Sequence, residues 1–158
     1  MSCGGKEEKK GKFQYDVQPE TTTKTTTETT TTTDTLEVVN DSIAAGANME
    51  NKGIGPITSY TFEEEVNTEL AAKGEAVFKQ MCTACHKTEQ KLIGPPVKGI
   101  FERRSVEWVM NMILNPEQML NEDPIAMELL KEHNNVRMLD QNLTEEDTKA
   151  LVEYFRTL

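Results

Sequence analysis

Five consecutive residues, Cys82-Thr83-Ala84-Cys85-His86, constrain this chain more than any other feature. Two thiols separated by two residues and followed by a histidine form the pattern of covalent haem attachment. The thiols add to the two haem vinyl groups, and the imidazole takes one axial position on the iron. A CxxC pair is also found in redox dithiols and in zinc sites, so the motif alone leaves both alternatives open. A zinc site would need a distant fourth ligand, His133 or Cys3.

The composition predicts one folded domain with a polar tail. The chain has 158 residues, and its apolar share of 36% is low for a fully folded chain of this length. The formal net charge of −10 argues against a nucleic-acid partner, because nucleic-acid-binding proteins present a basic patch. No run of about 18 apolar residues occurs, so we expect no segment of this sequence to span a membrane.

The polar part is the N-terminal third of the chain. Residues 1–59 are low in complexity, and the stretch from Thr21 to Thr35 is almost entirely threonine. Such a stretch has no apolar face to bury, so we predict a flexible linker over residues 1–59 and a folded domain over residues 60–158. As a coil of about 55 residues, this linker would span on the order of 40 Å.

Helical periodicity marks both ends of the predicted domain. We expect the folded part to begin near Phe62 and a helix, with Thr61 or Thr68 as its cap, to lead into the haem motif. A second helix is expected after Thr144, an N-cap followed by acidic residues and an apolar stripe. Gly74 lies in the middle of the first helix, where glycine costs about 1 kcal/mol against alanine. We therefore expect the two helices to cross closely there, with an aromatic ring over Gly74.

The spacing Gly74-x3-Phe78-x3-Cys82-x2-Cys85-His86, with Leu151-x2-Tyr154-Phe155 near the C-terminus, resembles a class I cytochrome c. The resemblance covers roughly residues 66–158. It implies an all-α fold, the class I cytochrome c fold, in which the terminal helices cross around one covalently bound haem c. These matches favour haem over zinc.

The stretch from Gly94 to Arg103 is similar to the loop that follows the haem motif in this family. The resemblance implies that the carbonyl of Pro95 accepts a hydrogen bond from His86, which fixes the orientation and basicity of that ligand. It also implies that Arg103 binds a haem propionate.

The sixth iron ligand has to be chosen from eight methionines. Met110 and Met112 lie in a predicted helix over residues 106–114, where methionine is usually part of the core. Met138 instead follows the Asn134-Asn135 helix breaker, in the loop where the family places its thioether ligand. We therefore expect His86 and Met138 to be the axial ligands. The alternatives for the sixth position are Met119, Met127 and His133.

Trp108 is the single tryptophan of the chain and lies near the start of the helix predicted over residues 106–114, for which we expect Ser105 to be the N-cap. Its side chain is either a core aromatic or donates its indole N–H to a haem propionate, and Arg104 either lies near the same place or faces solvent. The candidate cofactor-binding residues are Cys82, Cys85, His86, Met138, Pro95, Arg103 and Trp108.

The third cysteine, Cys3, lies in the stretch Met1-Ser2-Cys3-Gly4-Gly5, which resembles the end of a bacterial lipoprotein signal. The hydrophobic part of such a signal is not in this sequence. Because c-type cytochromes receive haem after export, as the family resemblance implies, we expect a longer reading frame or a trimmed signal. Cys3 would then be the lipid anchor that holds the protein on the periplasmic side of a bacterial membrane. The alternatives are an incidental thiol and a cloning remnant.

Histidine and methionine together leave no open iron position for a substrate or O2, so this ligation suits one-electron transfer. We predict a single-haem electron carrier, not an enzyme, that serves membrane-associated or periplasmic redox proteins. A haem sensor or small-ligand-binding domain is an alternative, as is a tethered electron-entry subunit of a terminal reductase. The stretch from Arg103 to Met138 is faintly similar to cytochromes that accompany nitrous oxide reductase systems.

Overall fold

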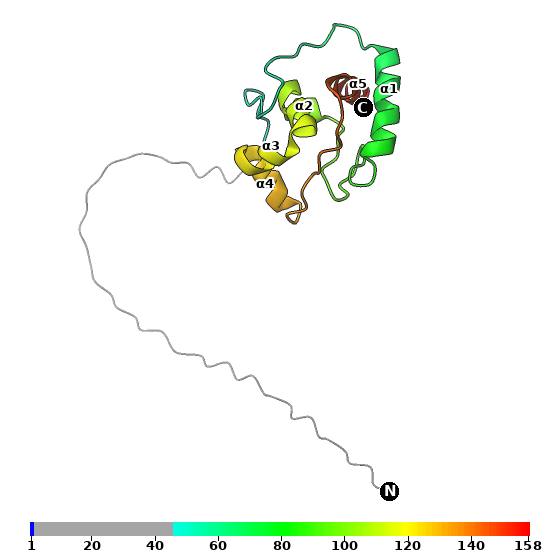
Figure 1. Ribbon diagram of the computed structural model, residues 1–158. Coiled ribbons are helices and arrows are strands. Elements are labelled where there is room, and N and C mark those ends of the chain that lie inside the picture. The colour runs from blue at the N-terminus through cyan, green and yellow to red at the C-terminus, as the bar shows by residue number, and fades with distance from the viewer. Residues whose placement is uncertain (2–45) are drawn as a thin grey trace, which may run out of the picture. The chain divides into compact units, whose positions relative to one another are not determined.

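The protein is described by a computed structural model that covers Met1 and residues 46–158 (Figure 1). In chain order its helical elements are α1 (Thr68–Met81), the 3-10 turn η1 (Ile100–Glu102), α2 (Val106–Leu114), α3 (Pro116–Glu122), α4 (Pro124–Glu132) and α5 (Glu145–Phe155). Within residues 46–158 the only β-type pairing is an isolated bridge between Asn48 and Arg104. The all-α prediction is confirmed. In the same residues, no helix combines the length and apolar character needed to cross a bilayer.

The helices α1 and α5 pack across each other (Figure 1). A Cβ atom on Gly74 would collide with the backbone carbonyl of Ala150 and lie 2.9 Å from the backbone nitrogen of Leu151. The close crossing is present, but the prediction of an aromatic ring over Gly74 is wrong. The ring contacts lie one turn further along α1, where Phe78 meets Tyr154 and Phe155 at centroid distances of 5.7 and 5.8 Å. Because Gly74 has no side chain, the α5 backbone at Ala150 and Leu151 packs directly against α1.

The start of α1 differs from the prediction. Its N-cap is Asn67, whose side chain accepts a hydrogen bond of 3.0 Å from the backbone N–H of Leu70. Neither Thr61 nor Thr68 is the cap. The backbone N–H of Asn67 donates to the buried Glu153 carboxylate of α5 at 2.7 Å, so a contact with the opposite end of the chain fixes this start.

Residues 46–59, the N-terminal strap, pack against α2 although the sequence assigned them to the linker. The Asn111 side chain, 1% exposed, donates to the carbonyls of Lys52 and Ile57 at 2.9 and 2.8 Å and accepts from the Ile57 N–H at 2.9 Å. Ser105 donates to the Asn51 carbonyl at 2.6 Å. Backbone groups of Asn51, Lys52 and Ile57 are thus paired with side chains of α2 and of its N-cap Ser105, and we propose that the folded domain includes residues 46–59. The rest of the predicted linker lies outside the described residues.

Candidate functional site

The CxxCH motif follows α1 directly. Cys82 is the C-cap of α1, and its carbonyl accepts hydrogen bonds from the backbone N–H groups of Cys85 and His86 at 3.1 and 2.9 Å. This tight turn directs both thiols and the imidazole to one cavity. Cys82 and Cys85 are not joined to each other by a disulfide, and burial, followed by the neighbouring Cys85, raises the pKa of Cys82 as an unattached thiol to about 11.

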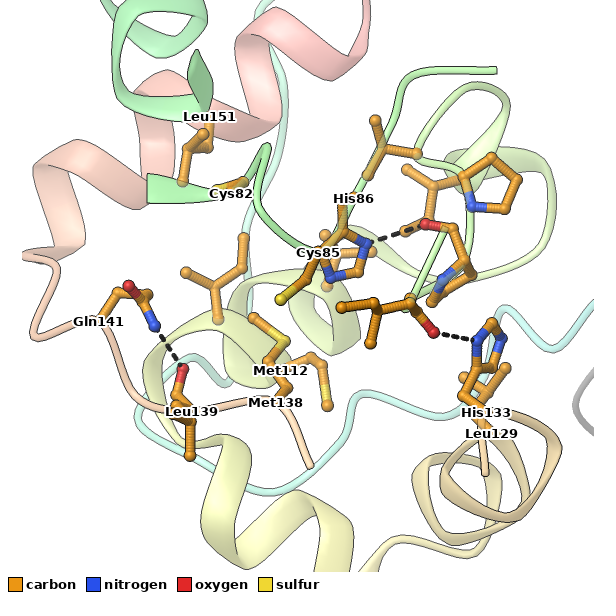
Figure 2. Close-up of a pocket in the computed structure, with 18 of the residues that line it drawn as sticks. Cys82, Cys85, His86, Met112, Leu129, His133, Met138, Leu139, Gln141 and Leu151 are labelled. Carbon is orange, nitrogen blue, oxygen red and sulfur yellow. Dashed lines mark hydrogen bonds between the residues drawn. The ribbon is translucent and has the colours of Figure 1, made fainter. Parts of the chain in front are cut away.

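His86 is held by the loop that follows the motif. Its Nδ1 lies 2.9 Å from the carbonyl oxygen of Pro95 (Figure 2). A carbonyl only accepts, so Nδ1 carries the proton and Nε2 keeps its lone pair for a metal. Burial lowers the pKa of His86, the Pro95 hydrogen bond opposes this shift, and the nearby His133 adds to the lowering. The neutral imidazole, which is the form that binds iron, is favoured.

Gly94 lies flat against the His86 ring. A Cβ atom on Gly94 would collide with Cε1 of the imidazole and lie 2.8 Å from both ring nitrogens. The backbone N–H of Gly94 donates to the Cys85 carbonyl at 2.8 Å, which ties the loop to the motif. The ring is thus held by a hydrogen bond at its edge and by van der Waals contact on its face.

Two thioethers come together in the cavity. Met138 lies in the segment between α4 and α5, after Asn134 and Asn135 with φ values of 58° and 57°. Figure 2 shows it beside Met112 of α2, and both residues line the cavity, as does Met81 at the end of α1. Periodicity assigned Met112 to the core. Several residues of that core also line the cavity. Helical spacing alone therefore does not distinguish a methionine buried in the core from one that lines the cavity.

The alternative methionine ligands lie elsewhere. Met119 does not line the cavity, and its sulfur accepts a hydrogen bond of 3.0 Å from the Ile54 N–H of the strap. Met127 is 38% exposed on α4 and does not line the cavity either. The remaining alternative, His133, does line it.

Three arginines, Arg103, Arg104 and Arg137, and the tryptophan Trp108 also line the cavity. The Arg103 guanidinium donates to the carbonyls of Pro96 and Lys98, each at 3.3 Å. Arg104 does not face solvent: it is 3% exposed, and its guanidinium lies 5.6 Å from the centroid of the Trp108 ring.

The indole N–H of Trp108 donates to the Asp123 carboxylate at 3.1 Å, and the ring is 3% exposed. Of the two roles left open for Trp108, this hydrogen bond favours the core role over donation to a propionate, because the N–H already has a buried partner. Asp123 also caps α4 through the Ala126 N–H.

The family model for cytochrome c matches residues 71–158. The chain belongs to the cytochrome c family. A solved cytochrome c from Rhodothermus marinus is 35% identical, with a TM-score of 0.63, over 65% of this chain and 88% of that one. A cytochrome c domain from Pseudomonas putida is 30% identical, with a TM-score of 0.50, over 53% of this chain and 85% of that one. These matches confirm the predicted class I cytochrome c fold.

The match to curated relatives is short. Cytochrome c2 of Rhodopseudomonas palustris is 49% identical over 35 residues, which is 22% of this cytochrome and 30% of the relative. The matched part of this cytochrome thus spans less than a third of that relative's length. Cytochromes c carry one covalently attached haem c, are electron carriers and not enzymes, and are typically exported to the periplasm.

The residues of this cytochrome fit haem c. The cavity is lined by the two thiols of Cys82 and Cys85, His86 with its unprotonated Nε2, thioether sulfur and the guanidinium groups of three arginines. When bound, haem c supplies a one-electron Fe(III)/Fe(II) couple. The apolar walls of the cavity include Phe78, Val97, Ile113, Leu130, Leu151 and Phe155. Within the part of the chain that the structure describes, no three His, Cys, Asp or Glu side chains cluster as a metal site, so the zinc alternative finds no support there.

Proposed function

We propose that this cytochrome passes single electrons between redox proteins through one haem c with His86 and Met138 as its axial ligands. The observation that carries the proposal is the shared cavity. It is lined by the thiols of the motif, by a His86 ring whose Nε2 carries no proton, and by the Met138 thioether. A histidine on one side and a methionine on the other leave no iron position for a substrate. A neutral thioether also favours the reduced iron and raises the potential.

Met138 is proposed as the ligand in preference to Met112 because it lies in an irregular segment. Met112 lies within α2, so the position of its Cα atom is fixed by the helix. Met138 follows two residues with positive φ, in a segment without helical hydrogen bonds, so its sulfur can approach an iron without disturbing helix packing.

Paired methionine substitutions test this ligation. Met138→Ala should abolish the thioether-to-iron absorption band of the oxidised protein, lower the reduction potential and let the reduced protein bind carbon monoxide. Met127→Ala, on the exposed side of α4, and Met112→Ala should leave the band in place. Loss of the band in Met112→Ala with its retention in Met138→Ala would transfer the ligand role to Met112. Carbon monoxide binding by the reduced wild-type protein would instead support a sensor.

We further propose that the protein is exported and held on the periplasmic side of a bacterial membrane by a lipid on Cys3. Cys3 lies outside the described residues, and the support is the lipoprotein-like stretch of sequence around it. Cys3→Ala should release the protein from the membrane fraction into the periplasmic extract without changing its spectrum. A variant that remains in the membrane fraction would refute the anchor.

A further inference from the structure

His133 connects two segments that the proposed function needs. It is the C-cap of α4 and is 8% exposed. Its Nδ1 lies 2.7 Å from the carbonyl oxygen of Ile93 (Figure 2). The carbonyl accepts, so the imidazole donates, and the bond joins residues that are 40 positions apart.

The Ile93 carbonyl belongs to the stretch that touches the axial histidine. Gly94 comes next and lies against the His86 ring, and the following Pro95 accepts the His86 Nδ1–H. The three residues are thus held from two sides, by His133 at Ile93 and by His86 at Pro95. A second link from the end of α4 to this loop is the bond from Lys91 Nζ to the Glu132 carbonyl at 3.2 Å, which is solvent-exposed and so contributes little.

His133 also begins the segment that carries Met138. Its carbonyl accepts a hydrogen bond of 3.1 Å from the Val136 N–H, and the Asn135 N–H returns to the Leu130 carbonyl at 2.8 Å. The chain then continues to Met138. One buried side chain therefore connects the end of α4, from which the Met138 segment departs, to the loop behind His86.

We propose that His133 is a positioning residue that holds the Ile93–Pro95 stretch against His86 and so sets the orientation and basicity of the axial imidazole. This inference rests on the proposed ligation by His86. Removing the donor leaves the Ile93 carbonyl without its partner and lets the stretch relax away from the ring. A weaker Pro95 hydrogen bond makes His86 a poorer donor to iron, which stabilises the oxidised state less. The reduction potential then rises.

The experiment compares three variants of the haem-loaded full chain. His133→Leu removes the donor, and His133→Asn keeps an N–H at the position of Nδ1. Ile125→Ala, at a site on α4 that is 1% exposed and does not line the cavity, controls for general loss of packing. The readouts are the reduction potential, the electron paramagnetic resonance g-values of the oxidised protein, which report the orientation of the axial ligands, and the melting temperature.

We expect His133→Leu to raise the potential and shift the g-values, and His133→Asn to restore both toward the wild type. Ile125→Ala should lower only the melting temperature. Wild-type potential and g-values in His133→Leu would overturn the inference, as would equal shifts in Ile125→Ala or no restoration in His133→Asn. Failure of the proposed function is seen separately, because the wild-type protein would then lack the haem c spectrum or its thioether-to-iron band before any variant is compared.

Discussion

Gly94→Ala is the sharpest local test of how the axial imidazole is held. The added Cβ would lie 2.8 Å from Nδ1 and Nε2 of His86 and still nearer to Cε1. Favourable contacts between such atoms begin at about 3.5 Å, so the ring or the loop must shift by about 0.7 Å or more. Gly94 is not among the glycines with positive φ, Gly53 and Gly99, so alanine suits its backbone and the contact alone is perturbed.

This clash has an expected size. Overfilling a packed site typically costs about 1–3 kcal/mol, and each kcal/mol lowers the melting temperature of a domain of this size by about 4–8 °C. The displaced ring also lengthens its bond to Pro95, so the reduction potential should rise. Thermal unfolding followed by circular dichroism and a potentiometric titration measure the two effects.

The matched control is Leu92→Ala, in the same loop. Leu92 is 42% exposed and does not line the cavity, so its truncation should change the melting temperature little and the potential not at all. The reasoning is refuted if Gly94→Ala melts and titrates like the wild type, or if Leu92→Ala shifts the potential equally.

Three further variants test the fold. Gly74→Ala should destabilise the protein in denaturant unfolding despite the gain in helix propensity of about 1 kcal/mol, because the new Cβ meets the α5 backbone; a more stable variant would disprove the close crossing. Asn111→Ala removes three hydrogen bonds to the strap, two of them buried, and should cost about 3 kcal/mol and speed proteolysis there; unchanged proteolysis would show that the strap is held otherwise. The Thr144 hydroxyl holds the pKa of Asp147 below its usual value, so this stabilisation is present above the unfolded pKa of about 3.9 and is lost as pH falls through the lower folded pKa. The stability difference between Thr144→Ala and the wild type should therefore shrink below about pH 4, and a constant difference would contradict it.

The features that the sequence predicted well depend on fixed short spacings. Ser105 and Thr144 cap α2 and α5 as expected, since an N-cap needs only a side-chain oxygen and the following turn. The glycine at the helix crossing follows from its cost within a helix. The CxxCH motif shares one turn and therefore one cavity.

The features that the sequence did not reveal are contacts between distant segments. The strap has the composition of a linker, and only the buried Asn111 amide shows why it is ordered. Trp108 has a propionate as a plausible partner until Asp123 is seen at 3.1 Å. From the sequence, His133 is considered only as an alternative metal ligand, and its contact with the loop behind His86 is not evident until its bond to Ile93 is seen. In each case a partner distant in the sequence decides the role of the residue or segment, and the local sequence pattern does not indicate that partner.

The central claim is tested most directly by a reduced-minus-oxidised spectrum, recorded during a potentiometric titration of the exported full chain. We predict the spectrum of one haem c, a thioether-to-iron band in the oxidised state and a single one-electron transition. A colourless protein, a tetrahedral metal in place of haem, or a haem without the thioether band would contradict it.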